Sequence, residues 1–84
     1  MSYVVVFLNG FTKQFRRLPG SVKARVRQRV IELSENPYLG LRLVGELSDY
    51  WKDRVGKYRM IYQIDETTKT IIMYDVDLRK RVYD

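Results

Sequence analysis

The chain has 84 residues, of which 45% are hydrophobic and 31% charged, a composition typical of one soluble globular domain over residues 1–84. It contains no Cys and no His, which excludes disulfides, thiol nucleophiles, thiolate metal sites and imidazole bases. Any chemistry must therefore come from Lys, Arg, Tyr, Ser, Thr or carboxylates. The net charge of +6 favours a polyanionic partner, although a solvated basic surface would give the same balance.

The first segment, residues 2–8, is a continuous run rich in β-branched residues, and we expect a strand that is buried on both faces. Its apolar part, Val4–Leu8, is far shorter than the roughly 20 residues that span a bilayer. No signal peptide or targeting segment is evident. We therefore expect a cytoplasmic protein without membrane contacts.

Two amphipathic helices should follow. Residues 11–18 repeat Phe and Leu at helical spacing, and Pro19-Gly20 ends this first helix. Ser21 suits the N-cap of a second helix, which ends at Asn36-Pro37 because Pro disfavours helical geometry in the residue before it. The narrow apolar stripe of the second helix comprises Val22, Val26, Val30 and Leu33.

The period of the pattern changes to two after the helices, which indicates strands. We expect three of them, at residues 50–55, 58–65 and 70–76. The predicted order is β-α-α-β-β-β. The fold class is α+β, an antiparallel sheet with both helices packed on one face.

The first two of these strands form a hairpin, since Gly56-Lys57 fits a two-residue type II′ turn with Gly first. This turn fixes a register in which Val55 is opposite Tyr58, Arg54 opposite Arg59, Asp53 opposite Met60 and Lys52 opposite Ile61. Alternation then puts Lys52, Arg54 and Arg59 on one face and mostly apolar side chains on the other. Two Arg residues directly opposite each other destabilise a sheet, so the cluster indicates a functional site.

Acids of the third strand or the tail offer an alternative, because Asp75 or Asp77 would neutralise these cations if the register brought them there. The tail adds Arg79, Lys80, Arg81 and Tyr83. If the third strand is antiparallel to the second, its end returns near Arg54 and Arg59. Several cations with a Tyr suit a phosphodiester, because Arg binds phosphate oxygens in pairs and aromatic rings stack on unpaired bases.

The hairpin Trp51–Tyr62 resembles the W-x-x-R-x-G-x-Y-R-x-x-Y signature of the RelE/ParE toxin superfamily. The ending Leu78–Tyr83 is similar to the basic stretch that closes in an aromatic residue in that family. The element order agrees too, so the resemblance covers essentially the whole chain. It implies the toxin of a type II toxin–antitoxin pair.

The resemblance to RelE implies a ribosome-dependent endoribonuclease that cuts mRNA in the A site with neither metal nor cofactor. It implies three partners: the ribosome, its mRNA, and an antitoxin whose acidic segment lies along the helices or covers the Lys52/Arg54/Arg59 face. The alternative is a ParE-like toxin that inhibits a protein target such as DNA gyrase without catalysis. The two share a fold, and a fold does not settle function.

The catalytic positions that the resemblance implies are Lys52, Arg54, Arg59, Arg79 and Tyr83. In this mechanism the 2′-OH attacks the adjacent phosphate with Lys52 or Tyr83 assisting proton removal. The other three stabilise the phosphate, and Arg79 can also protonate the leaving oxygen. The expected RNA-binding residues are Lys23, Arg25 and Arg27 of the second helix, with Lys80 and Arg81 of the tail. For the helix residues, antitoxin contacts or a solvated face remain the alternatives.

Overall fold

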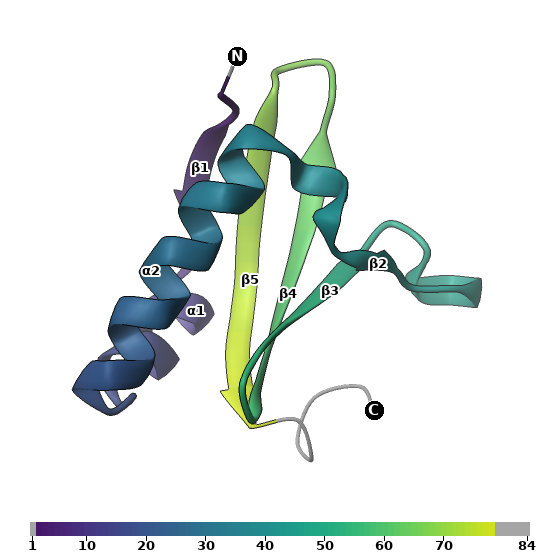
Figure 1. Cartoon of the computed structure of the whole chain (residues 1–84). Helices are drawn as coiled ribbons and strands as arrows, with labels where there is room; N and C mark the ends of the chain where they lie inside the picture. The colour runs from purple at the N-terminus through teal and green to yellow at the C-terminus, as the bar shows by residue number, and fades with distance from the viewer. Residues whose placement is uncertain (1, 79–84) are drawn as a thin grey trace.

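The computed structural model of the chain describes residues 2–78 (Figure 1). Its main elements are β1 (Val4–Phe7), α1 (Asn9–Arg16), α2 (Gly20–Glu35), β2 (Leu41–Arg42), β3 (Trp51–Val55), β4 (Tyr58–Asp65) and β5 (Thr70–Leu78). Two short 3-10 helices, η1 (Pro37–Leu39) and η2 (Gly45–Leu47), flank β2. Within the described residues, no helix has the length and apolar character needed to cross a membrane.

The strands form one mixed sheet in the order β1-β5-β4-β3-β2, which Figure 1 shows from left to right. Neighbouring strands are antiparallel from β2 to β5, whereas β1 is parallel to β5, with Val4 opposite Thr70. The predicted α+β class is confirmed, with β2 as an additional short strand. The expected wholly antiparallel sheet is wrong at β1. Residues 8–69 separate β1 from β5, so no local turn signals their relative direction.

Strand β1 is an edge strand, and the expectation that it is buried on both faces is wrong. Val4 is 63% exposed, and Val6 and Phe7 are also exposed. A continuous apolar run is typical of a central strand, but the pattern alone does not say whether a neighbour covers it. Here the sheet continues only on the β5 side of β1.

The two helices form largely as predicted, with small shifts at their ends. Helix α1 begins at Asn9, and α2 begins at Gly20 after Pro19, one residue before the expected cap. Val26, Val30 and Leu33 of the predicted stripe are buried. Their spacing of three and four residues keeps them on one side of α2, so that side faces the sheet.

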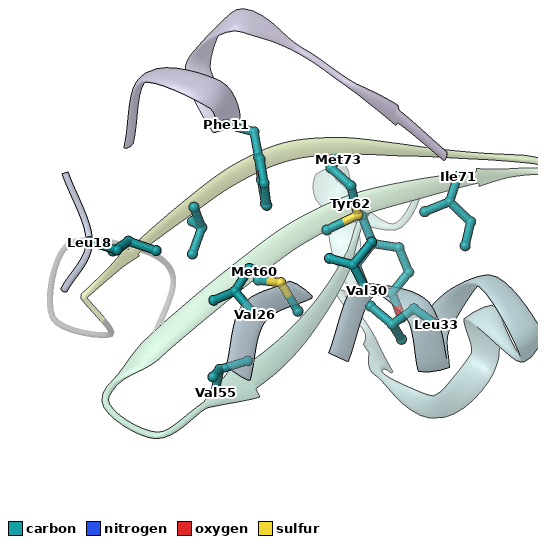
Figure 2. Close-up of a cluster of buried hydrophobic side chains, with 11 residues drawn as sticks. Phe11, Leu18, Val26, Val30, Leu33, Val55, Met60, Tyr62, Ile71 and Met73 are labelled. Carbon is teal, nitrogen blue, oxygen red and sulfur yellow. The ribbon is translucent and has the colours of Figure 1, made fainter. Parts of the chain in front are cut away.

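The hydrophobic core lies between the helices and one face of the sheet. Figure 2 shows Phe11 of α1 and Leu33 of α2 in the same cluster as Met60 and Tyr62 of β4. Both helices thus cover one face, as predicted. The buried Tyr62 hydroxyl donates a hydrogen bond of 2.7 Å to the carbonyl of Pro37 in η1, and burial raises the pKa of this hydroxyl. This bond holds η1, the segment that precedes β2, against the sheet. The basic side chains of β3 and β4 lie on the other face of the sheet, away from this core.

Candidate active site

The β3–β4 hairpin has the predicted register. Val55 pairs with Tyr58, Arg54 with Arg59, Asp53 with Met60 and Lys52 with Ile61. Within the turn, positive φ occurs at Gly56 (+58°) and not at Lys57, as a type II′ turn requires. The turn therefore brings Lys52, Arg54 and Arg59 together on the face of the hairpin opposite the one that carries the core residues Val55 and Met60.

These three cations differ in accessibility. Arg54 is exposed, Lys52 is half-buried, and Arg59 is only 2% exposed. An exposed guanidinium is open to a phosphate, so Arg54 is the most accessible of the three. Arg59 contributes to packing as well as to charge, and substitutions there are expected to disturb the fold.

Two carboxylates of β5 lie on the same outer face. The register puts Asp77 directly across from Arg59, and puts Asp75 across from Ile61, the residue that pairs with Lys52 on its other side. Each carboxylate accepts a hydrogen bond from the next backbone N–H, at 2.9 Å for Asp75 and 2.8 Å for Asp77. The cations thus share their face with acids, as the alternative interpretation of the cluster expected. The face combines both charges rather than being uniformly basic.

Burial raises the pKa of Asp75; the Val76 N–H opposes this shift, and the charge of nearby Asp77 adds to it. A carboxyl whose folded-state pKa is raised destabilises the folded protein once it ionises, so the penalty is absent at low pH and present above the folded pKa. We expect Asp75→Asn to increase the free energy of unfolding at pH 7, and the gain to vanish below about pH 3. Urea unfolding at both pH values measures this. The exposed Asp49→Asn is the control, and a loss of stability at pH 7 in Asp75→Asn would contradict the prediction.

An ion pair joins helix α2 to the hairpin. Arg29 donates from Nε to Asp53 Oδ2 at 2.5 Å and from Nη2 to Asp53 Oδ1 at 3.1 Å, while its Nη1 donates to Glu32 at 2.9 Å. These hydrogen bonds raise the pKa of the guanidinium, the bond to Asp53 most of all. Asp53 lies opposite the core residue Met60, and the period of the strands does not indicate a partner for its charge. Arg29 neutralises Asp53 and thereby holds β3 against α2.

The three basic residues of α2 that we expected to bind RNA lie in two places. Lys23 and Arg27 lie over the ring of Phe15, at 6.0 and 5.2 Å from its centroid, so they contact α1. Arg25 instead reaches the hairpin, since a Cβ added at Gly56 would lie 3.1 Å from its Nη1. Of the three, Arg25 is thus the residue next to the turn of the hairpin that carries the predicted catalytic residues.

An aromatic pair that the sequence did not reveal joins Tyr50, the residue before β3, to Tyr74 of β5. The rings of Tyr50 and Tyr74 meet edge to face, with centroids 5.1 Å apart, and a hydrogen bond between these side chains raises the pKa of Tyr50. The β4–β5 register shifts after Ile61, which leaves Tyr74 as an extra residue in β5. An irregularity of this kind has no signature in a period of two, so strand alternation could not place Tyr74.

The remaining predicted site residues, Arg79, Lys80, Arg81 and Tyr83, lie outside the described residues. What the structure shows is where β5 ends: Leu78 pairs with Tyr58, beside the hairpin turn, as expected. Across residues 2–78, His, Cys, Asp and Glu side chains form no group of three or more that could hold a metal ion. Of the five predicted catalytic residues, the structure thus describes Lys52, Arg54 and Arg59.

Comparison with known proteins gives consistent matches along the chain. A family model for the ParE toxin of the type II toxin–antitoxin system parDE matches residues 5–83. Toxin RelG of Mycobacterium tuberculosis is 32% identical, over 99% of this chain and 98% of its own length. The mRNA interferase toxin RelE of Escherichia coli is 23% identical, over 96% of this chain and 87% of its own length.

Solved structures agree with the sequence matches. The structure of the toxin–antitoxin complex RelBE2 from Mycobacterium tuberculosis contains a chain that superposes with a TM-score of 0.86 at 31% identity, covering 94% of this chain and 93% of that one. Isolated RelE of Escherichia coli has the same fold, with a TM-score of 0.82 at 22% identity. Matches of this extent establish the family. The chain belongs to the RelE/ParE superfamily and is a toxin of the type II toxin–antitoxin class.

Proposed function

We propose that this toxin is a ribosome-dependent endoribonuclease that cleaves mRNA in the A site. The observation that carries the proposal is the hairpin register, which gathers Lys52, Arg54 and Arg59 on one face of the sheet. The relative from Escherichia coli named an mRNA interferase supports the same activity. The proposed enzyme acts as one domain of residues 1–84 in the cytoplasm, where it meets ribosomes.

The proposed reaction is an internal transfer at one phosphate of the mRNA. The 2′-oxygen forms a bond to phosphorus while the bond to the 5′-oxygen of the next nucleotide breaks, which leaves a 2′,3′-cyclic phosphate. The proton leaves the 2′-OH, and the departing 5′-oxygen receives one. Arg54 and Arg59 stabilise the negative charge that grows on the phosphate, the largest expected contribution. Lys52 or Tyr83 assists proton removal, and Arg79 steadies the phosphate or protonates the leaving oxygen.

Incubation of the purified toxin with ribosomes that carry a defined mRNA tests this proposal. Mapping the cut ends should reveal cleavage within the A-site codon and a 2′,3′-cyclic phosphate at the new end. The competing candidate is a ParE-like toxin that inhibits gyrase. Growth arrest without mRNA cleavage, together with loss of DNA supercoiling by gyrase in vitro, would replace the nuclease by that candidate.

We also propose that an antitoxin holds the toxin inactive. Solved complexes of related toxins with antitoxins support this, among them the RelBE2 complex and the RelE–RelB complex of Pyrococcus horikoshii. An apolar hollow of about 470 Å³ lies between α1 and α2, where Phe15 and Ile31 contribute to its lining. Arg27 lines it too and would attract an acidic segment. The antitoxin segment is therefore expected along the helices.

Substitution of Ile31 tests that placement. Ile31 is exposed in the hollow, so a charge there leaves the toxin folded but must be buried when a partner covers it. We expect Ile31→Asp to weaken the binding of the cognate antitoxin by about tenfold or more, measured by calorimetry. The control is Ala24→Asp, at an exposed position of α2 that does not line the hollow. Equal affinities of the two variants would exclude this hollow as the antitoxin site.

A further inference from the structure

A second hollow, of about 280 Å³, lies between α2 and the tip of the β3–β4 hairpin. Arg25 from α2 and Arg54 from β3 both line it, and Gly56 forms part of its wall. The guanidinium of Arg25 lies against Gly56, where a Cβ would come within 3.1 Å of Nη1. The turn thus needs Gly for its positive φ, and the missing side chain also leaves room for the guanidinium.

The charges around this hollow are unevenly compensated. Arg29 and Glu32 also line the hollow. Arg29 forms ion pairs with Asp53 and with Glu32, so the charges of these three side chains are already compensated. The ion pairs described for residues 2–78 involve neither Arg25 nor Arg54. Both of these side chains are exposed. Arg25 and Arg54, which both line the hollow, therefore carry positive charge that the described ion pairs do not neutralise.

We propose that Arg25 and Arg54 bind one backbone phosphate of an RNA in this hollow, next to the phosphate that is cleaved. The inference rests on the proposed nuclease function, because Arg54 would then contact both the scissile phosphate on the outer face and the second phosphate in the hollow. Guanidinium groups suit this task, since their donors match the oxygens of a phosphodiester and stay charged at any physiological pH. Arg25 then acts as a binding residue that positions the RNA strand across the tip of the hairpin.

Continuity with the outer face favours RNA over an acidic peptide. Arg54 pairs with Arg59 on the face where the scissile phosphate is proposed to bind, and it also lines the hollow. A nucleic-acid strand carries a phosphate at every nucleotide, so a strand held at the outer face presents its next phosphate to a neighbouring site. The phosphate belongs either to the mRNA or to ribosomal RNA, and both have this chemistry.

The test compares Arg25→Gln with Arg17→Gln, which removes an equal charge from an exposed residue outside the hollow. One arm measures, by fluorescence anisotropy over a salt series, binding of a labelled 2′-O-methyl RNA oligonucleotide, which lacks the attacking hydroxyl. The other measures cosedimentation with ribosomes free of mRNA. We expect Arg25→Gln to weaken binding about tenfold in at least one arm and to lower the salt slope by about 0.7, with little change in Arg17→Gln. The affected arm identifies the RNA that supplies the phosphate.

Equal losses of RNA affinity in Arg25→Gln and Arg17→Gln would attribute the effect to net charge and overturn the proposal. So would unchanged RNA binding in Arg25→Gln, and in that case loss of binding to a poly-glutamate peptide would assign the hollow to a protein carboxylate. The nuclease is tested separately. If the wild-type protein binds at least one of the two RNAs with the expected dependence on Arg25 but does not cleave mRNA, the phosphate site is supported and the nuclease function is excluded. If it cleaves, Arg25→Gln should raise KM for programmed ribosomes and leave kcat unchanged.

Discussion

Replacement of Arg54 by Ala should lower the rate of mRNA cleavage on programmed ribosomes by about 10²- to 10³-fold, the usual cost of removing one donor that stabilises transition-state charge. Arg54 is exposed, so its truncation leaves no cavity and the melting temperature should stay near that of the wild type. Single-turnover cleavage at saturating ribosome concentration measures the effect on the chemical step. Arg59→Ala is a poorer probe, because Arg59 is buried and its loss also disturbs packing.

Two further variants sharpen this experiment. Arg54→Lys keeps the charge but loses the paired donors of the guanidinium, so its rate should fall between those of the wild type and Arg54→Ala. Arg16→Ala removes an exposed cation from α1 and controls for net charge. Full activity in Arg54→Ala would remove this residue from the site, and losses of similar size in Arg54→Ala and Arg16→Ala would attribute the effect to ribosome attraction.

Replacement of Asp53 by Ala should lower the free energy of unfolding by about 2–3 kcal/mol. The Asp53 side chain is 9% exposed and receives two hydrogen bonds from Arg29, so its removal leaves a partly buried cation without its main acceptor. Urea unfolding followed by circular dichroism measures the loss. Cleavage activity should also fall at temperatures where the wild type is still folded, because this pair holds β3, and with it Lys52 and Arg54, against α2.

The second carboxylate on Arg29 supplies the control. Glu32 side-chain exposure is 44%, and an exposed ion pair within a helix contributes only a few tenths of a kcal/mol, so Glu32→Gln should be nearly neutral. A double variant, Arg29→Met with Asp53→Leu, removes both charges and should recover much of the stability lost in Asp53→Ala. Equal destabilisation by Asp53→Ala and Glu32→Gln would contradict the special role of the buried pair.

The hairpin was predictable residue by residue because a two-residue turn leaves little freedom. Once Gly56-Lys57 is recognised as the turn, every pairing of β3 with β4 follows, and Lys52, Arg54 and Arg59 fall on one face. The end of the third strand was expected beside the turn only if that strand ran antiparallel to the second, and β5 does so, with Leu78 opposite Tyr58. Local rules therefore determined the part of the candidate site that lies on adjacent strands.

Contacts between distant segments were not predictable in this way. The parallel pairing of β1 with β5, the partner that Arg29 provides for Asp53 and the approach of Arg25 to Gly56 each join elements far apart in the sequence. Periodicity assigns a residue to a face, but it does not say which element covers that face. For the same reason the pattern favoured a buried β1, although the strand lies at the edge of the sheet.

The position of β5 in the sheet affects how the protein folds during its synthesis. Strand β5 lies between β1 and β4, yet it is translated after every other strand. Until it leaves the ribosome, β1 has no strand to pair with, and the β3–β4 hairpin lacks a neighbour on its β4 side. Such long-range pairing forms late and slowly during folding. A nascent toxin therefore completes this sheet only after its last described strand has been made, so the outer face that carries Lys52 and Arg54 is assembled late.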